Sequence, residues 1–296
     1  MVIHYTTTFR GVLWHIGWVC IVYCLFGGCS EPEVAPCEDC PRFVYDGLER
    51  EYFLHKPDNL PTNAPLVFLL HGYGGGIVGL RDSDMNALAD EHGFAVCYPQ
   101  GALDDSEIHH WNARLEISDV DDIGFLTALA QELQNMHALS PERTFICGIS
   151  NGGFMSYTMA CEAPEVFAAA GSIIGSMSGY SWENRAATTS AVPILQISGV
   201  ADDIVPIDGS MSTEGGWGGA PHMDQIIEYW ADFNECTAID TLTISSHTTA
   251  YHHTGGINGN EVWYYKIEEF GHEWPDNSNI AGFNTSEKLW EFFSRF

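Results

Sequence analysis

Short apolar runs alternate with helix-like segments through residues 42–296, and this alternation constrains the fold more than any other feature of the chain. The runs at 66–70 and 94–99 are continuously apolar, as is typical of strands buried on both faces of a sheet. We expect strands at 42–46, 49–56, 66–70, 94–99, 144–149, 167–175, 193–198 and 261–267, and helices at 85–93, 121–139, 151–162, 222–234 and 286–296. Strands separated by helices predict an α/β fold with a mostly parallel central sheet and helices on both faces.

Two long connections, 103–120 and 205–221, interrupt the alternation. In a compact domain, a long loop without regular structure is usually functional. No Pro-, Gly- or Ser-rich linker divides the chain after residue 41, so we expect 42–296 to form a single domain.

The first 28 residues differ from the rest of the chain. They contain one basic residue, Arg10, no acidic residue, and an apolar run that ends at Cys29. This pattern predicts a signal peptide over 1–28 and export to the cell envelope or the medium. The ending LFGGCS resembles a bacterial lipoprotein signal, although Leu25 lies four rather than three residues before the cysteine. Lipidation of Cys29 would anchor the chain to a membrane, such as the outer membrane. The alternative is a single membrane span, for which the run is only just long enough.

Residues 29–41 are acidic and rich in proline, which predicts a tether. The whole chain is also acidic, with 40 Asp+Glu against 11 Lys+Arg and a formal net charge of −29. A nucleic acid partner is excluded, because binding one requires a basic surface that neutralises phosphates.

The cysteines suggest a mixture of disulfides and buried thiols. The Cys-x-x-Cys at 37–40 predicts a small loop disulfide or half of a zinc site, and no second Cys-x-x-Cys follows to complete the latter. Cys97 and Cys147 lie in apolar strand-like runs, so we expect buried free thiols. We expect Cys161 and Cys236 to form a second disulfide in an oxidising compartment.

One serine lies between two glycines where a predicted strand gives way to a predicted helix. The pattern Gly148-x-Ser150-x-Gly152 matches a nucleophile elbow, a tight turn that exposes a serine hydroxyl. The glycines are needed because a Cβ atom at either position would collide with neighbouring backbone. The alternative is an ordinary Gly-rich turn, but the strand before it and the helix after it favour a nucleophile.

A serine nucleophile needs a base and an orienting acid, and an elbow of this kind predicts the chain order Ser, acid, His. Asp202 and Asp203 lie just past a predicted strand, and His272 lies in a loop after the next predicted strand. Both positions fall at the carboxyl ends of strands, where open α/β sheets bind their ligands. We therefore expect Ser150 to attack, His272 to carry the proton and Asp202 to orient the imidazole.

Other histidines compete for the role of base. His252 and His253 lie in the stretch YHHTGG, which we expect to be a surface turn. His222 starts a predicted helix, and His247 lies in a polar run. None of them follows a strand and precedes an aromatic segment as His272 does.

The oxyanion of a tetrahedral intermediate needs two donors. The amide of Asn151, at the start of the helix, is one candidate. The second should come from the glycine-rich loop LLHGYGGG at 69–76, in which Tyr73 follows His71 and Gly72. No Gly-Lys-Ser/Thr follows this loop, so it is not a phosphate-binding loop.

The motifs LLHGYGG, FAVCYPQG, WNA, DVDDIGFLTAL, GISNGGFMSYTMACEAPEVFAA, GVADDIVP and GHEWP occur in this order over about residues 50–275. Together they resemble the polyhydroxybutyrate depolymerase / feruloyl esterase family of α/β-hydrolases, which is similar to carbohydrate esterase family 1. The resemblance implies an α/β-hydrolase fold, serine-dependent hydrolysis of carboxylic esters, no cofactor or metal, and secretion. It places the nucleophile on Ser150, the acid on Asp202 rather than Asp203, and the base on His272.

The same resemblance suggests further roles. Trp111 and Trp274 match family tryptophans and are expected either to form aromatic walls for the substrate or to pack and shape their loops. Asp121 and Asp122 match an Asp pair that caps a helix. The chain ends after its last predicted helix at Phe296, which favours soluble esters, such as feruloylated or acylated oligosaccharides and short polyesters, over crystalline polymer.

The sequence thus predicts a secreted serine carboxylesterase that works through an acyl-enzyme on a small or oligomeric ester. It resembles either a feruloyl esterase or a depolymerase of polyhydroxybutyrate-type polyesters. One alternative is a serine peptidase of the prolyl-oligopeptidase type, which uses the same triad order. Another is a non-catalytic glycan-binding protein of the cell envelope. The sequence makes no prediction of the oligomeric state.

Overall fold

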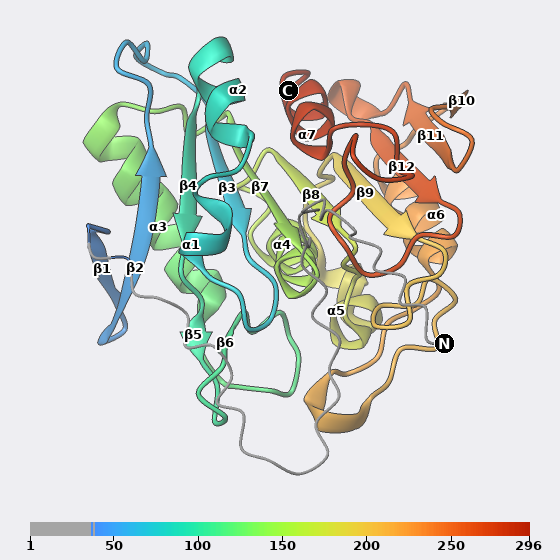
Figure 1. Ribbon diagram of the computed structural model, residues 1–296, viewed down its shortest axis with the longest axis horizontal. Coiled ribbons are helices and arrows are strands. Elements are labelled where there is room, and N and C mark those ends of the chain that lie inside the picture. Colours follow the sequence, from blue (N-terminus) through green and yellow to red (C-terminus); the bar gives the residue numbers. More distant parts are fainter. Residues whose placement is uncertain (1–36, 38) are drawn as a thin grey trace, which may run out of the picture. The chain divides into compact units, whose positions relative to one another are not determined.

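The computed structural model describes residue 37 and residues 39–296, which belong to one compact unit (Figure 1). The predicted signal peptide over 1–28, the lipidation site Cys29 and most of the predicted tether lie outside the described residues. Within the described part of the chain, no helix combines the length and the apolar character needed to cross a bilayer.

The core of the molecule is a ten-stranded sheet with the strand order β1-β2-β4-β3-β7-β8-β9-β12-β11-β10. The strands β4, β3, β7, β8, β9 and β12 pair in parallel, and the two outer strands on each side pair antiparallel. The bounds are β1 Arg42–Tyr45, β2 Leu48–His55, β3 Leu66–Leu70, β4 Ala95–Pro99, β7 Thr144–Ile149, β8 Ala169–Ile173, β9 Ile194–Gly199, β10 Ala238–Thr243, β11 Thr248–Thr254 and β12 Val262–Ile267, with a separate hairpin of β5 Ala102–Leu103 and β6 His109–His110.

Helices cover both faces of this sheet (Figure 1). Side chains of α3, α4 and α6 pack in one buried cluster, and those of α1, α2 and α7 pack in another. Successive residues of β3 alternate between the two clusters, as the pleat of a strand buried on both faces requires. The bounds are α1 Ile77–Leu80, α2 Met85–His92, α3 Asp122–His137, α4 Asn151–Glu162, α5 Gly179–Asn184, α6 Met223–Phe233 and α7 Thr285–Phe293, with 3-10 turns at Arg185–Ala187, Glu214–Gly216 and Ile257–Gly259. The predicted α/β fold is confirmed.

The antiparallel pair β10 and β11 was not predicted, and the expected surface turn at His252 and His253 is wrong. Both histidines lie in β11, where His252 pairs with Trp263 of β12 and stacks on its indole at a centroid distance of 3.9 Å. All six residues of β10 are exposed. Because β10 has no buried face, its residues show no alternating apolar pattern, and backbone pairing with β11 defines the strand.

The two aspartates of the helix pair have different roles. Asp121 caps α3, because its carboxylate accepts from the Gly124 amide at 2.9 Å, and Asp122 lies inside the helix. The Asp122 carboxylate forms a buried ion pair with Arg50 of β2 and accepts from the Asn112 amide at 2.6 Å. This pair fixes the loop 103–120 against the sheet.

Replacing Asp122 by Ala is expected to lower the free energy of unfolding by about 3–5 kcal/mol, because Arg50 would stay buried without its counter-ion. The matched variant Asp121→Ala removes an N-cap acceptor and is expected to cost only about 1–2 kcal/mol. Urea denaturation at pH 7 measures both values. Equal losses in the two variants would contradict a special role for the buried pair.

The cysteine predictions have mixed outcomes. Cys37 and Cys40 form a disulfide, and Cys97 and Cys147 are buried free thiols as predicted. The expected bridge between the thiols at 161 and 236 is wrong, because both are free. The first is buried at the end of α4, where desolvation raises its pKa to about 12, and the second donates to the backbone carbonyl of residue 253 in β11 at 3.7 Å. Each thiol thus has its own packing environment.

Candidate active site

The nucleophile elbow has the geometry that its glycines suggest. Ser150 lies between β7 and α4 with φ 52° and ψ −117°, a left-handed conformation that costs energy for a residue with a side chain. A Cβ atom on Gly148 would lie 2.5 Å from the Gly152 carbonyl, and one on Gly152 would lie 2.6 Å from the carbonyl oxygens of Leu70 and His71. Glycine is therefore required at both positions, and the turn holds Ser150 at the end of β7.

Three predicted side chains form one hydrogen-bonded chain. His272 Nε2 lies 2.9 Å from Ser150 Oγ, and His272 Nδ1 lies 2.7 Å from Asp202 Oδ2. Because an ionised carboxylate only accepts hydrogen bonds, Nδ1 carries the proton and Nε2 is left to accept from the serine hydroxyl. The arrangement is that of a nucleophile, a base and an orienting acid.

The acid is held rigidly. The Asp202 side chain is almost fully buried, and its Oδ1 atom accepts from the amides of Ile204 and Val205 at 2.9 and 2.8 Å. Its neighbour Asp203 is exposed. The structure thus separates the two candidate acids, and only Asp202 contacts His272.

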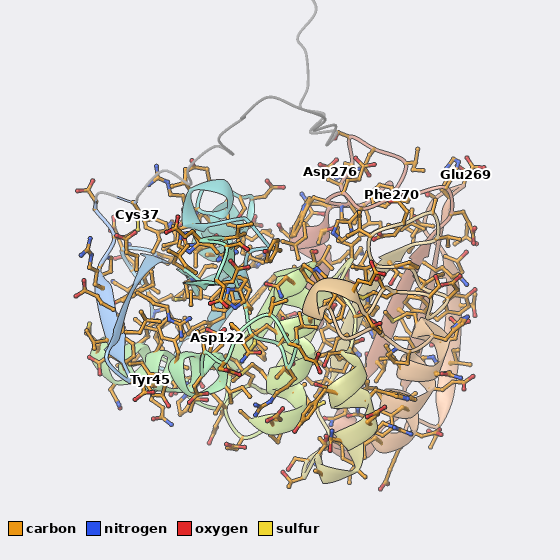
Figure 2. The ribbon with its side chains drawn as sticks, turned by 90° about the horizontal axis from the view of Figure 1, so that it is seen from below. Cys37, Tyr45, Asp122, Glu269, Phe270 and Asp276 are labelled. Atoms are coloured by element: carbon orange, nitrogen blue, oxygen red, sulfur yellow. A yellow bond between two sulfur atoms is a disulfide. The ribbon has the colours of Figure 1, made fainter. Side chains whose placement is uncertain are left out.

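The fold explains why residues so distant in sequence meet. Ser150 follows β7, Asp202 follows β9, and His272 lies in the loop after β12, so all three come from the carboxyl edge of the parallel sheet. Figure 2 shows Phe270 and Asp276 of the loop that carries His272. Phe270 is buried and its carbonyl accepts from the Ala201 amide at 2.9 Å, which ties this loop to the one that carries Asp202.

The residues predicted to donate to the oxyanion, Asn151 and Tyr73, each directly follow a residue of the turn or one packed against it. Asn151 is the first residue of α4, where a backbone N–H has no acceptor within the helix. Tyr73 follows Gly72, whose Cβ position would lie 3.4 Å from the Ser150 Cβ atom. The loop after β3 therefore passes directly beside Ser150.

Trp111 packs inside the protein and holds its loop in place. The expectation that it forms an aromatic wall for the substrate is therefore wrong. Trp111 is fully buried, its backbone forms two hydrogen bonds with the Asn151 side chain at 2.7 and 2.9 Å, and its indole donates to the His71 carbonyl at 3.0 Å. It thereby joins loop 103–120, the elbow and the loop after β3. Trp274 is partly buried and packs against the core on the α1, α2 and α7 face.

His71 is a buried residue beside the site for which the sequence suggested no role. Its Nδ1 lies 2.7 Å from the Gly72 carbonyl, and its Nε2 accepts from the Gly101 amide at 2.9 Å, so the ring is neutral with the proton on Nδ1. Burial is the main cause that lowers its pKa to about 4. This ring fixes the loop after β3 to the β5–β6 hairpin.

The depressed pKa of His71 predicts a loss of stability in acid. An unfolded histidine has a pKa near 6.5, so between about pH 6.5 and 4 the unfolded chain binds more protons than the folded one. The free energy of unfolding is therefore expected to fall by about 3 kcal/mol from this group as the pH drops through that window. Urea denaturation at pH 7 and pH 4 should show a smaller loss for His71→Gln, which does not titrate. The same pH dependence in both proteins would rule His71 out as the source.

The two long loops meet at Tyr73. The Tyr73 hydroxyl donates to Asp104 at 2.6 Å, and its ring lies edge-to-face with that of Trp217 at a centroid distance of 5.1 Å. The Glu116 amide donates to the Gly216 carbonyl at 2.8 Å, which joins loops 103–120 and 205–221 directly. Trp217 was missed from the sequence, because no local pattern links it to the loop after β3.

Within the described residues, no group of three or more His, Cys, Asp or Glu side chains is arranged to hold a metal ion. The sheet is mostly parallel, and a strained serine lies between a strand and a helix. An acid and a histidine follow the serine in that order. These features define an α/β-hydrolase. Solved structures share this fold. An acetyl xylan esterase from Aspergillus awamori superposes with a TM-score of 0.61 at 18% identity, over 83% of this chain and 94% of that one. A Bacillus cereus carboxylesterase superposes with a TM-score of 0.54 at 15% identity, over 83% and 95%.

The chain belongs to the esterase PHB depolymerase family, whose model matches residues 51–231. The match includes Ser150 and Asp202 and ends before His272. Among curated proteins, the chain is 34% identical over 175 residues to a putative esterase NocK of Nocardia uniformis subsp. tsuyamanensis (56% of this chain, 49% of that protein). It is 34% identical over 130 residues to poly(3-hydroxyalkanoate) depolymerase C of Paucimonas lemoignei (42% and 31%) and 27% identical over 171 residues to feruloyl esterase C of Emericella nidulans (55% and 58%). The chain thus spans about half of the first relative and less than a third of the second.

Proposed function

We propose that this protein is a serine carboxylesterase that hydrolyses carboxylic esters through an acyl-enzyme. The observation that carries the proposal is the hydrogen-bonded order Ser150–His272–Asp202, with 2.9 Å between the serine and the imidazole and 2.7 Å between the imidazole and the carboxylate. Membership of an esterase family supports it.

In the proposed reaction, Ser150 Oγ attacks the ester carbonyl while His272 Nε2 takes the hydroxyl proton. Asp202 stabilises the imidazolium that forms, and the amides of Tyr73 and Asn151 donate to the oxyanion. The tetrahedral intermediate collapses, the C–O bond to the alcohol breaks, and His272 returns the proton to the leaving alcohol. Water then attacks the acyl-enzyme with His272 as base, which releases the acid and restores Ser150.

We propose an acylated oligosaccharide or a short polyester as the substrate. Relatives are named feruloyl esterase, acetylxylan esterase and poly(3-hydroxyalkanoate) depolymerase, which supports both classes. Tyr73 follows Gly72, which lies against Ser150, and its ring pairs with that of Trp217. This aromatic pair favours a flat acyl group, since such pairs present large, rigid apolar surfaces.

A substrate panel tests this proposal. Methyl ferulate, p-nitrophenyl acetate and butyrate, hydroxybutyrate trimer and a peptide p-nitroanilide should be compared through kcat/KM. The esterase proposal expects turnover of the esters and none of the peptide. Cleavage of the peptide alone would instead establish a peptidase, and turnover of none of the compounds would favour a protein that only binds.

We also propose that the chain is exported and anchored through Cys29. The apolar segment that precedes Cys29 supports export, and the disulfide at 37–40 is typical of an oxidising compartment. Metabolic labelling of the full chain with an alkyne analogue of palmitate tests the anchor. The wild-type protein should incorporate the label, and the Cys29→Ala variant should not. Equal labelling of the two proteins would contradict the lipidation proposal.

A further inference from the structure

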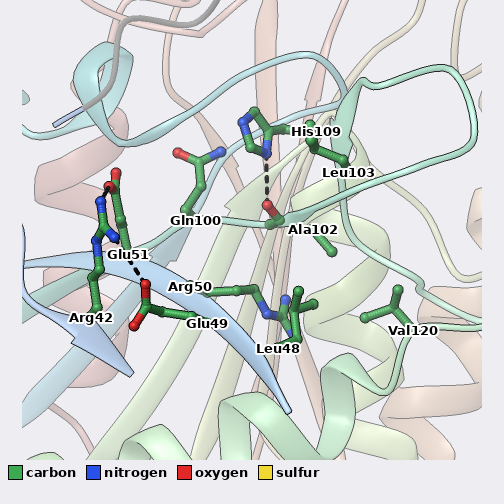
Figure 3. A pocket seen from close by; sticks show the side chains of 11 residues that line it. Arg42, Leu48, Glu49, Arg50, Glu51, Gln100, Ala102, Leu103, His109 and Val120 are labelled. Atoms are coloured by element: carbon green, nitrogen blue, oxygen red, sulfur yellow. Dashed lines mark hydrogen bonds and ion pairs between the residues drawn. The ribbon is translucent and has the colours of Figure 1, made fainter. Parts of the chain in front are cut away.

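A cavity of about 560 Å³ lies between the β1–β2 hairpin and the β5–β6 hairpin (Figure 3). Neither Ser150 nor His272 lines it. It nevertheless adjoins the active site, because its lining residue Gly101 donates to His71, which directly precedes Gly72 beside Ser150. The ring of His109, another lining residue, lies edge-to-face with that of His71 at 6.5 Å.

The walls of the cavity combine apolar surface with charged groups. Leu48 and Leu103 line it and remain 41% and 51% exposed. At its rim, the Arg42 guanidinium contacts the Oε1 atoms of Glu49 and Glu51 at 2.9 and 3.2 Å (Figure 3). Arg42 thus uses one oxygen of each carboxylate, and each carboxylate has a second oxygen with which to accept a hydrogen bond.

These groups discriminate between classes of ligand. An ionised carboxylate only accepts hydrogen bonds, so a ligand that uses Glu49 and Glu51 must supply donors. Sugar hydroxyl groups are donors, whereas the interior of a polyester chain has none. The positive charge of Arg50 is already paired with Asp122, which leaves two carboxylates against one guanidinium at the rim and disfavours an anionic ligand.

We propose that this cavity is a subsite for a neutral oligosaccharide, with the sugar rings against the exposed leucines and the hydroxyl groups on the carboxylates and Arg42. The inference rests on the proposed esterase function, and it selects acylated oligosaccharides over polyesters as the substrate. Because Ser150 does not line the cavity and the two are connected through Gly101 and His71, we expect a substrate that reaches both to contain more than one sugar unit.

Isothermal titration of the Ser150→Ala protein with unesterified xylotetraose tests the subsite without turnover. We expect saturable binding, and a Kd at least fivefold weaker when Leu103→Glu is added. Leu242→Glu is the matched control, since Leu242 is 42% exposed on β10, lies outside the cavity, and its replacement makes the same change in charge. This control should leave the Kd unchanged.

Thermal unfolding checks that the variants fold. If the Leu103→Glu variant does not fold, a second measurement replaces it. Xylotetraose is added to the Ser150→Ala protein, and binding is read from amide chemical-shift changes in β1 and β2. Three results would overturn the subsite: no xylotetraose binding, equal weakening by both glutamate variants, or displacement of xylotetraose by hydroxybutyrate trimer at lower concentration. Failure of the esterase proposal is separate, because it would appear as a wild-type protein that does not hydrolyse p-nitrophenyl acetate.

Discussion

Replacing Ser150 by Ala is expected to lower kcat on p-nitrophenyl acetate by about 10⁴- to 10⁶-fold, because the nucleophile and the base act as a unit. The fold should persist, since the hydroxyl contacts His272 at 2.9 Å and no part of the core. Steady-state kinetics, with single-turnover measurement for the variant, gives the ratio. The exposed Ser106 provides the matched control, and Ser106→Ala should keep wild-type activity.

The strained backbone of the elbow gives this prediction a second readout. Ser150→Gly should lose activity to the same extent but gain about 1 kcal/mol in free energy of unfolding over Ser150→Ala, because glycine adopts a positive φ without steric cost. A Ser150→Ala protein that retains even a tenth of wild-type kcat would refute the nucleophile assignment.

Replacing Asp202 by Asn is expected to reduce kcat by about 10⁴-fold. The amide would favour the wrong imidazole tautomer and would not stabilise its cation. The loss should appear in kcat rather than in KM, since Asp202 contacts the base and not the substrate in the proposed reaction.

The neighbouring carboxylate supplies the control for this result. Asp203 is exposed, so Asp203→Asn should change kcat by about twofold or less. Comparable losses in the two variants would show that the acid has been assigned wrongly, because the two changes remove the same charge from adjacent positions.

The fold could be predicted because each buried strand appears in the sequence as a short, continuous run of apolar residues. The runs at 66–70 and 144–149 became β3 and β7 with the same bounds, and the segment 151–162 became α4. The strands β10 and β11 were missed because β10 is exposed along its whole length and β11 buries few residues, of which Ala250 alone is apolar. Apolar and polar residues alternate along a strand only when one of its faces is buried. An edge strand that stays exposed, such as β10, therefore shows no such alternation.

The candidate site was also predictable only in part. The elbow glycines and the order Ser150, Asp202, His272 were readable, since each residue follows a strand and parallel strands end at one edge of the sheet. No local pattern separates Asp202 from Asp203, and the family resemblance favoured Asp202; in the structure Asp202 is buried against His272 and Asp203 is exposed. For Trp111 the sequence misled: its position in a polar loop suggested contact with a substrate, but the side chain is fully buried.

The sequence by itself determined the layered α/β architecture, the strained serine turn and the order of the residues that follow it. Only the tertiary structure decided which loops meet: Tyr73 with Trp217, His71 with Gly101, and Leu48 with Leu103 across one cavity. The physical reason is that local pattern encodes burial and backbone conformation, whereas a contact between segments tens of residues apart depends on how the whole sheet places their ends. The residues expected to select the substrate belong to this second group.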